Sequence, residues 1–401
     1  MKRTENIGDG LFLVEGMNKW ALYDLFGQSI RVVDPGTANY LAQIAQSSAE
    51  VPEKLEYLLR ETPEIHRNCA EEGILDRMFR PDTSESQAKL EVLDIAWVEI
   101  TEACNEKCVH CYAESGPVRS RGMSVGTAKK VLDQLKSAKF RKCQIVGGEP
   151  LVHKGFWEIL EYARSLGFEE LEVFSNATLF RNDDLEKLSK MGVSLATSVF
   201  GHTEEIHDAC TKTPGSFRKW LKNLREAKKL GIPFRIGLVR MRQNETHMDE
   251  IRDFLLTEGF IEDESQFGFD DVRESGRGAD VSIAPTIRMA HAPYLKVTPR
   301  QFHKARRYNP CWFGEMVVSP DGSVHPCVFS RDVTLGNLTK DTVASIVSEQ
   351  KNKYWAISLD TVDKCKDCEF RYACNDCRSL SMAQGRGLHG APARCDYDPS
   401  A

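Results

Sequence analysis

Between residues 95 and 272, short apolar runs alternate with segments whose apolar residues recur about every 3.6 positions. Phe156, Trp157, Leu160 and Ala163 illustrate the helical spacing, and Gly167 stands where such a helix would end. The strand-like runs cover residues 95–100, 143–146, 171–174, 193–199, 234–239 and 267–272. Six strand–helix repeats predict a parallel sheet with right-handed crossovers. Because six repeats are too few to close an eight-stranded barrel, we expect a curved, partial (β/α)6 barrel of the α/β class.

The pattern on either side of this segment is different. Residues 11–14, 21–26 and 29–33 are strand-like, Asp34-Pro35-Gly36 begins a helix, and Leu55, Leu58 and Leu59 suggest another. This order predicts a small α+β, winged-helix-like domain over residues 1–90. A polar stretch at 81–87 is typical of a linker to the barrel, which we place at 91–300. In residues 301–401 the helical pattern thins and cysteines become frequent, so metals are expected to help hold that domain together.

Each chemically suggestive motif of the barrel segment follows a predicted strand. Residues 104–111 follow the first strand, Gly147-Gly148-Glu149-Pro150 the second, Ser175-Asn176-Ala177-Thr178 the third, and Phe200-Gly201-His202 the fourth. The carboxyl ends of parallel strands meet at one rim of such a fold. The sequence therefore predicts one site at that rim.

Composition narrows the kind of protein further. The chain has 401 residues, enough for two or three domains, and its formal net charge of −6 offers no overall basic field for nucleic acid or anionic lipid. No apolar run approaches the ~18 residues of a membrane span, and no hydrophobic stretch of the secretory kind follows the charged first residues. We expect a cytoplasmic protein whose partners include neither nucleic acid nor a membrane.

The 13 cysteines are the unusual feature of the composition. An odd number without an export signal argues against a disulfide framework, and clustered thiols in a reducing compartment indicate metal ligands. Cys104, Cys108 and Cys111 lie within eight residues of one another. A structural zinc site needs four ligands, and His110 could supply the fourth only by folding back. Three thiolates on a [4Fe–4S] cluster would instead leave one iron open, which catalysis can use.

Together these residues resemble the radical S-adenosylmethionine superfamily. The resemblance rests on Cys-x3-Cys-x2-Cys after the first barrel strand, His110 before the third cysteine, and Gly147–Pro150 after the second strand. It implies that S-adenosylmethionine chelates the open iron of a [4Fe–4S] cluster and is split to a 5′-deoxyadenosyl radical. It further implies cofactor contacts at the positions that match the family: Gly147, Gly148, Glu149, Ser175, Asn176 and Ser198. A strand-end turn is the alternative for Ser175 and Asn176.

The later cysteines resemble the SPASM extension of such enzymes, which carries two auxiliary [4Fe–4S] clusters. By that resemblance, one complete cluster is held by Cys365, Cys368, Cys374 and Cys395, and the other by Cys311, Cys327 and Cys377. Two departures from the family pattern stand out. The spacing from Cys374 to Cys377 is x2 rather than x3, and no further cysteine lies between Cys311 and Cys327, so the second cluster lacks a visible fourth thiolate. A zinc knuckle is the alternative, but it leaves Cys311, Cys327 and Cys395 unexplained.

The substrate is the most open question at this stage. Residues 198–217 resemble the fourth-strand region of SPASM peptide maturases, and the first domain resembles winged-helix modules that capture leader peptides by adding a strand to a sheet edge. We therefore expect an oxidoreductase that cross-links a ribosomally made precursor peptide through a carbon–carbon or thioether bond, with flavodoxin or ferredoxin as reductant. Oxidation of Ser or Cys on a sulfatase-like protein, small-molecule radical chemistry, and a non-enzymatic electron carrier or sensor remain alternatives. No general base is identified; His202, Glu204, His207 and Arg240 lie near the expected rim.

Overall fold

The six strands predicted between residues 95 and 272 all form, and they pair in parallel in chain order. They are β5 (Ile95–Glu99), β6 (Lys142–Val146), β7 (Glu170–Phe174), β8 (Ser194–Val199), β9 (Phe234–Arg240) and β10 (Asp270–Asp271). The last strand is much shorter than the predicted run, because Phe267 and Phe269 lie before it rather than within it. The partial parallel barrel predicted from the sequence is therefore confirmed.

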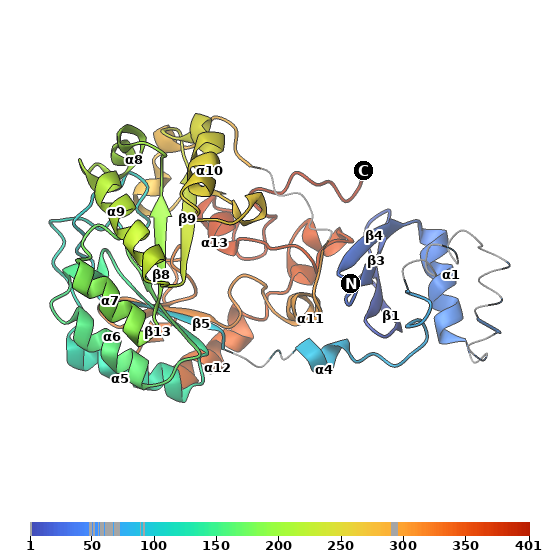
Figure 1. Ribbon diagram of the computed structural model, residues 1–401. Coiled ribbons are helices and arrows are strands. Elements are labelled where there is room, and N and C mark those ends of the chain that lie inside the picture. The colour runs from blue at the N-terminus through green and yellow to red at the C-terminus, as the bar shows by residue number, and fades with distance from the viewer. Residues whose placement is uncertain are drawn as a thin grey trace. The chain divides into compact units, whose positions relative to one another are not determined.

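The computed structural model describes residues 2–47, 73–88, 90, 93–289 and 296–401, with a few isolated positions between 50 and 67 (Figure 1). It divides into two compact units, which are described separately here. The first unit comprises residues 1–91, 290–313 and 351–401, and the second comprises residues 92–289 and 314–350. The predicted helical positions Leu55, Leu58 and Leu59 lie outside the described residues.

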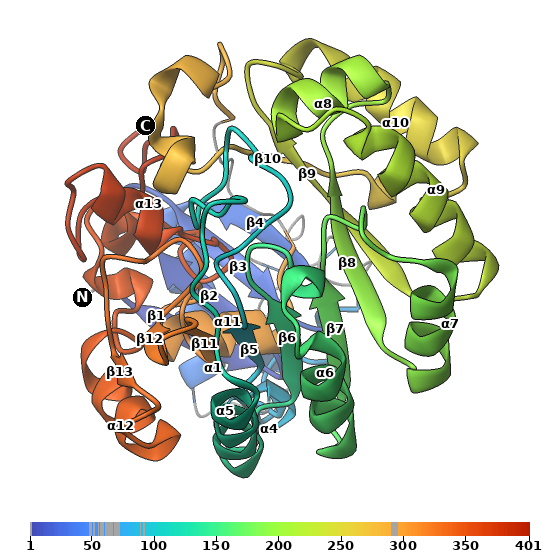
Figure 2. The ribbon, with the colours of Figure 1, turned by 90° about the vertical axis from the view of Figure 1, so that its left-hand side faces the viewer.

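Helices separate the strands of the second unit. The α-helices are α5 (Val125–Ser137), α6 (Phe156–Ser165), α7 (Asn182–Met191), α8 (Glu204–Thr211), α9 (Ser216–Lys229) and α10 (Met248–Thr257), and short 3-10 turns include η1 (Pro150–Val152), η2 (Glu245–His247), η3 (Glu264–Gln266), η4 (Gly276–Ala279) and η5 (Val281–Ile283). Figure 2 shows α6, α7 and α9 along the outside of strands β6–β8. Buried side chains of both layers form the main core, as Ile145 on β6 and Leu160 on α6 illustrate. The Trp220 indole N–H on α9 donates to the Thr197 hydroxyl of β8 at 3.1 Å, which joins helix and sheet.

The sequence analysis did not predict three further strands that extend this sheet. They are β11 (Glu315–Val318), β12 (Ser323–His325) and β13 (Gly336–Asn337). β11 pairs in parallel with β5, and β12 and β13 follow antiparallel, so the sheet has nine strands in the order β10-β9-β8-β7-β6-β5-β11-β12-β13. The helix α12 (Val343–Lys353) comes next along the chain. Part of the segment from 301 onward thus belongs to the barrel sheet, while the proposed domain limits remain a prediction.

The first unit begins with an antiparallel four-stranded sheet. Its strands are β1 (Thr4–Gly8), β2 (Leu11–Glu15), β3 (Trp20–Asp24) and β4 (Ser29–Val33), of which β1 was not predicted. The predicted helix is α1 (Pro35–Gln46), and Asp34 caps it by accepting from the Thr37 N–H at 2.9 Å. Leu11, Leu13 and Leu22 on one sheet face pack with α1 residues such as Leu41.

The other face of this sheet packs against two later segments of the same unit. Phe12 and Tyr23 share a core with Phe302 on α11 (Pro299–Arg307) and with Phe370 near the C-terminus. The predicted linker at 81–87 is wrong in part, since residues from 84 onward form a short helix, α4 (Ser84–Ala88). This helix packs against α11, where the Ser84 hydroxyl lies 2.7 Å from His303 Nε2, a long-range contact that the local sequence pattern does not reveal.

The cysteine-rich end of the first unit has little regular structure. It contains the 3-10 turns η6 (Leu359–Thr361) and η7 (Cys365–Asp367) and the short helix α13 (Arg378–Ala383). Its apolar core is small, with Ile357, Leu359 and Val362 as members. The fully buried Arg371 compensates in part, since its guanidinium donates to Asp360 and to the Glu15 carbonyl. No helix among the described residues combines the length and apolar character that a membrane span requires.

Candidate active site

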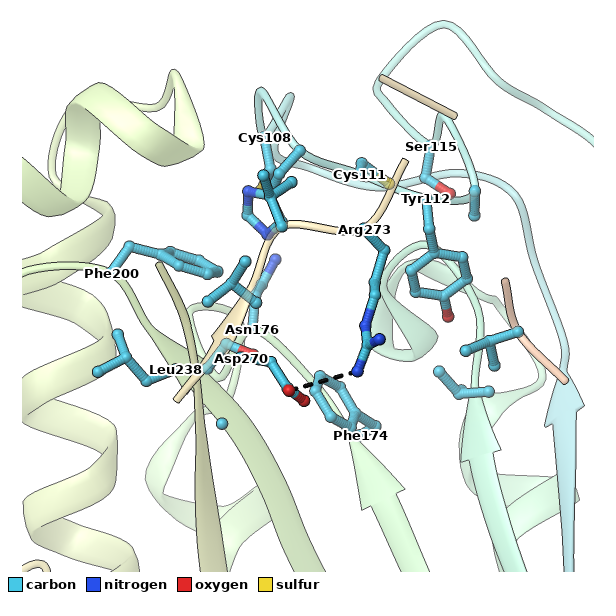
Figure 3. A pocket seen from close by; sticks show the side chains of 18 of the residues that line it. Cys108, Cys111, Tyr112, Ser115, Phe174, Asn176, Phe200, Leu238, Asp270 and Arg273 are labelled. Carbon is cyan, nitrogen blue, oxygen red and sulfur yellow. Dashed lines mark ion pairs between the residues drawn. The ribbon is translucent and has the colours of Figure 1, made fainter. Parts of the chain in front are cut away.

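Cys104, Cys108 and Cys111 lie in the loop after β5 and line one end of a cavity of about 550 Å³ (Figure 3). The cavity begins at the rim predicted from the sequence and extends along the inner face of the strands as far as Trp97 on β5 and Arg235 on β9. Figure 3 shows Phe174, Phe200 and other side chains pointing into it from the strands below the loop. The three thiols therefore face an open cavity large enough for a small molecule.

The glycines after β6 support the cysteine loop from one side. The Gly148 N–H donates to the Thr101 carbonyl at 2.7 Å, and the Glu149 N–H donates to the Ala103 carbonyl at 2.8 Å. A Cβ on Gly147 would lie 2.5 Å from the Thr101 oxygen, and one on Gly148 would collide with the Ala103 carbonyl. Only glycine allows the two loops to approach this closely.

Helix α8 supports the same loop from a second side. The Lys107 and Val109 N–H groups donate to the carbonyls of Thr211 and Cys210, at 3.1 and 2.9 Å. The buried Glu106 carboxylate accepts from the Ser216 hydroxyl at the start of α9. Backbone and side-chain hydrogen bonds thus fix the cysteine loop to the α8–α9 pair.

A third support comes from η4, which the sequence analysis did not identify. The Arg277 guanidinium donates to the carbonyls of Cys108 and Ser115, both at 2.8 Å. Gly276 has φ +55°, and a Cβ there would lie 2.6 Å from the Cys111 carbonyl oxygen. The available signal was the Gly-Arg-Gly sequence shortly after the sixth strand, where two glycines permit close contact with another loop.

The candidate S-adenosylmethionine contacts fall into two groups. Gly147, Gly148, Asn176 and Ser198 line the cavity beside the thiols. Ser175 and Glu149 are buried behind it and bond to each other, with 2.9 Å between the hydroxyl and the carboxylate. The four lining residues can touch a molecule in the cavity through side chains or backbone. The buried pair Ser175 and Glu149 instead shapes the turns on which lining residues stand.

Glu149 is the most constrained of these residues. Burial raises the pKa of its carboxyl to about 7, and hydrogen bonds from the Leu151 and Asn176 N–H groups and the Ser175 hydroxyl partly oppose that rise. Its two oxygens thereby tie the loop after β6 to the loop after β7. Asn176 continues the connection by donating to Asn105 Oδ1, at 2.9 Å, within the cysteine loop.

The four rim residues considered for acid–base chemistry lie in different surroundings. His207 is buried and lines the cavity, and burial lowers its pKa to about 4, so it is neutral near pH 7. Its Nδ1 accepts from the Phe200 N–H at 3.3 Å. Arg240 is paired with buried Asp271 at 2.7 Å, Glu204 forms an exposed ion pair with Arg218, and His202 does not line the cavity. Of the four, His207 alone lines the cavity, and its two ring nitrogens already contact the Phe200 N–H and the Ser216 hydroxyl.

The chemistry of the three thiols suits an iron–sulfur cluster. Burial raises the pKa of the Cys104 thiol to about 12, and that of Cys108 well above its ordinary value. Thiolates at these positions are therefore stable only beside positive charge such as that of iron. Cys104, Cys108 and Cys111 form no disulfide, and the cavity beside them leaves room for a ligand.

The later cysteines divide between the two units. Cys365, Cys368, Cys374 and Cys395 surround one small cavity in the first unit, and none of the four is in a disulfide. This is the set predicted for a complete cluster, and four thiols around one cavity suit such a group. Cys311 and Cys377 also belong to the first unit, whereas Cys327 follows β12 in the second. The grouping of those three stays a prediction.

Several cavity residues were missed by the sequence analysis. The aromatic residues Trp97, Tyr112, Phe269 and Phe329 line the cavity with Phe174, and Arg273 forms an ion pair with Asp270 at 3.3 Å (Figure 3). Trp97 and Phe174 were in predicted strands, and alternation along those strands could have assigned them to the inner face. Phe329 follows the unpredicted strands β11 and β12, so the sequence pattern offered no means of placing it.

Comparison with known families agrees with this geometry. Residues 98–255 match the Radical SAM superfamily, and residues 311–378 match SPASM, an iron-sulfur cluster-binding domain. The first match covers the cysteine loop and strands β6–β9, and the second begins at Cys311. The two families are those that the cysteine spacing suggested.

Two of the relatives are named for different activities, one for bacteriocin biosynthesis and the other for heme synthesis. The chain is 30% identical over 302 residues to the antilisterial bacteriocin subtilosin biosynthesis protein AlbA of Bacillus subtilis, across 70% of this chain and 66% of that protein. It is 24% identical over 341 residues to an AdoMet-dependent heme synthase of Oleidesulfovibrio alaskensis, across 76% of this chain and 87% of that protein.

Solved structures agree on the fold. Streptococcus suis SuiB bound to precursor peptide SuiA superposes with a TM-score of 0.58 at 13% identity, and the match covers 99% of this chain and 100% of that one. At such low identity the likeness concerns the fold alone. It includes the residues before the barrel as well as the barrel itself.

Proposed function

Because the chain belongs to the radical S-adenosylmethionine superfamily and carries a SPASM domain, we propose that it oxidatively modifies a ribosomally made peptide, forming a carbon–carbon or thioether cross-link. The observation that carries the proposal is the juxtaposition of Cys104, Cys108 and Cys111 with a cavity of about 550 Å³ whose lining includes several aromatic side chains. Similarity to a bacteriocin biosynthesis protein supports a peptide substrate.

Within this proposal the cavity residues bind and orient. Cys104, Cys108 and Cys111 hold a [4Fe–4S] cluster, and the backbone of Gly147 and Gly148 lies where it can meet the methionine moiety of S-adenosylmethionine. Asn176 and Ser198 lie on the same wall. When bound, the cluster and S-adenosylmethionine supply a 5′-deoxyadenosyl radical. The aromatic walls exclude water, which protects such a reactive species from side reactions.

The auxiliary sites complete the cofactor set. We assign Cys365, Cys368, Cys374 and Cys395 to one auxiliary cluster, since these four thiols surround a single cavity. We assign Cys311, Cys327 and Cys377 to the other, on the SPASM spacing. A flavodoxin or ferredoxin in the cytoplasm would serve as reductant, in keeping with thiols that must stay reduced to bind iron.

The N-terminal sheet is our candidate for capturing the leader segment of the precursor. Among the described residues, β4 pairs with β3 on one side only, whereas the outer side of β1 is partly covered where the Phe79 N–H donates to the Ile7 carbonyl. An edge strand with unpaired N–H and C=O groups can accept an added peptide strand. Val32 on β4 is about half exposed, which offers an apolar contact for such a strand.

A small-molecule radical enzyme is the second candidate, because the chain also resembles an AdoMet-dependent heme synthase. A tetrapyrrole carries carboxylates that need cationic partners. Three arginines line the cavity, and each is already bonded: Arg235 to Glu172, Arg273 to Asp270, and Arg277 to two loop carbonyls. The electrostatics of the cavity therefore favour the peptide over the tetrapyrrole.

Cofactor cleavage tests the proposal. Anaerobically reconstituted protein, given dithionite and S-adenosylmethionine, should release 5′-deoxyadenosine and contain about 12 iron atoms for three clusters. The Cys108→Ala variant is the matched control and should release none. Incubation with short peptides encoded beside the gene should then give a product two mass units lighter for each cross-link. Absence of 5′-deoxyadenosine, or zinc in place of iron, would refute the proposal.

A further inference from the structure

Part of the cavity is lined by aromatic rings, one of them that of Tyr112, directly after Cys111. Trp97 on β5 and Phe174 on β7 line this part, together with Tyr112, Phe269 and Phe329 from the loops. Tyr112 and Phe329 meet edge to face, with ring centroids 5.4 Å apart. We call this region the aromatic chamber, defined by these five residues. Such a wall favours apolar and aromatic groups through area burial and ring contacts.

The charged groups around the aromatic chamber already have partners. Arg235 donates through Nε and Nη2 to both oxygens of Glu172, at 2.9 and 2.8 Å, and Gln144 donates to the same carboxylate. Arg273 reaches across to Asp270 at 3.3 Å and also lies over the Phe329 ring (Figure 3). A charged side chain that entered the chamber would have to give up part of its hydration against the aromatic rings, which is costly.

Gly237 is a strand position of the cavity lining that carries no side chain. It lies in the middle of β9 and lines the cavity, although glycine weakens a strand interior. Its backbone does not require glycine: a Cβ there would lie 3.5 Å from Ser198 Oγ and 3.7 Å from the Thr197 oxygen, which are ordinary contacts, and its φ is not in the left-handed region. Glycine at this position therefore leaves space in the cavity rather than relieving strain.

We infer that the aromatic chamber receives a bulky, uncharged apolar side chain of the peptide, and that Gly237 sets how large that side chain can be. This inference rests on the proposed function, because it concerns the residue presented to the radical. It predicts that charged residues are rejected and that filling the space above Gly237 shifts the preference toward small residues.

The test compares five synthetic peptides, acetyl-Gly-Gly-Xaa-Gly-Gly-amide with Leu, Phe, Ala, Lys or Glu at Xaa. Reconstituted holoenzyme, its G237A and G237V variants, S-adenosylmethionine and dithionite are combined with each peptide, and 5′-deoxyadenosine is measured. Deuterium at Xaa reports whether the hydrogen comes from that residue. Leu and Phe should exceed Lys and Glu by about tenfold or more, the scale on which an apolar pocket discriminates.

For each variant, the rates with two peptides are compared as a ratio. Because both rates come from the same enzyme preparation, a change in cofactor binding lowers both and cancels in the ratio. The rate with Leu divided by the rate with Ala should fall in the order wild type, G237A, G237V, by about tenfold or more in total. A mere loss of folding would lower both rates without this graded change. If Lys or Glu is preferred, if no peptide raises the rate, or if the ratio stays constant, the inference is wrong while cofactor cleavage stands. If no variant or wild type cleaves S-adenosylmethionine, the proposed function itself fails.

Discussion

Two cysteine-bearing regions of the molecule are held in place by different means. The loop of Cys104–Cys111 rests on the nine-stranded sheet and its large core, and hydrogen bonds from the loop after β6, from α8 and from η4 fix its backbone. The region around Cys365–Cys395 has short helical turns and a small apolar cluster of its own, and its Phe370 and Tyr372 pack against the N-terminal sheet of the same unit. Its four thiols surround one small cavity.

The difference shows what each set of thiols is for. In the first region the protein holds the loop, so a metal bound there can leave one coordination position to a ligand without loss of structure. In the second region the chain has less regular structure and a smaller apolar core of its own, so we expect a bound cluster to contribute more to the stability of the fold, as ligands of folded states do. The first region suits catalysis and the second suits structure or electron transfer.

The largest expected effect comes from removing one thiol in each region. Cys108→Ala should reduce 5′-deoxyadenosine release to the background level yet leave the thermal midpoint close to that of the wild type, because protein contacts hold its loop. Cys368→Ala should lower the thermal midpoint clearly. Anaerobic melting followed by circular dichroism and the cleavage assay measure both effects. If Cys108→Ala lowered the thermal midpoint more than Cys368→Ala does, the cysteine loop and not the C-terminal region would be the one that depends on its cluster for stability.

Removing iron altogether should affect the two regions unequally. After anaerobic chelation, backbone amides of residues 357–395 should exchange hydrogen at least about 100-fold faster, whereas those of β6 and β7 should keep their protection, since exchange reports local unfolding. Mass spectrometry of peptic fragments gives the measurement. Uniform deprotection of both regions would show that the cysteine loop depends on metal as much as the C-terminal segment does.

The first region was the more predictable one. Its strands carry continuous apolar runs, and its chemistry follows them in sequence, so the six parallel strands and the rim position of Gly147 and Asn176 could be derived from spacing, whereas Ser198 came from the family resemblance. The iron–sulfur and S-adenosylmethionine chemistry predicted from Cys104, Cys108 and Cys111 is that of the matched families.

What the sequence could not supply depends on long-range packing. Strand β11 has only four residues and lies some 215 positions from its partner β5, so no local pattern links Glu315 to Ile95. The role of Arg277 is likewise invisible in a Gly-Arg-Gly sequence until its guanidinium is seen between two carbonyls. Tertiary contacts decide both, and spacing rules describe only local periodicity.

The η4 contact allows a smaller test of how the first region is held. Arg277→Met removes two charge-assisted hydrogen bonds to the cysteine loop and should lower the free energy of unfolding by about 2 kcal/mol. Arg218→Met is the matched control, because Arg218 forms an exposed ion pair with Glu204, for which less than about 1 kcal/mol is expected. Anaerobic urea denaturation of the holoenzyme measures both. Equal losses would mean that η4 does not support the loop.

The smallest expected effect concerns acid sensitivity, and it also belongs to the first region. Burial holds the pKa of His207 on α8 at about 4, below its ordinary value near 6.5, so the unfolded chain takes up a proton in that interval and the folded chain does not. The contribution of neutral His207 to the free energy of unfolding is therefore complete above pH 6.5. It is lost as the pH falls toward 4, by about 1 kcal/mol between pH 6.5 and 5.5.

The His207→Gln variant tests this, because it keeps an acceptor for the Phe200 N–H but cannot titrate. Between pH 6.5 and 5.5 its free energy of unfolding should fall by about 1 kcal/mol less than that of the wild type. Urea denaturation at pH 7.5, 6.5 and 5.5 gives the difference between the two proteins, in which the contributions of other buried histidines such as His303 cancel. Parallel pH profiles would show that protonation of His207 does not weaken the α8 support of the cysteine loop.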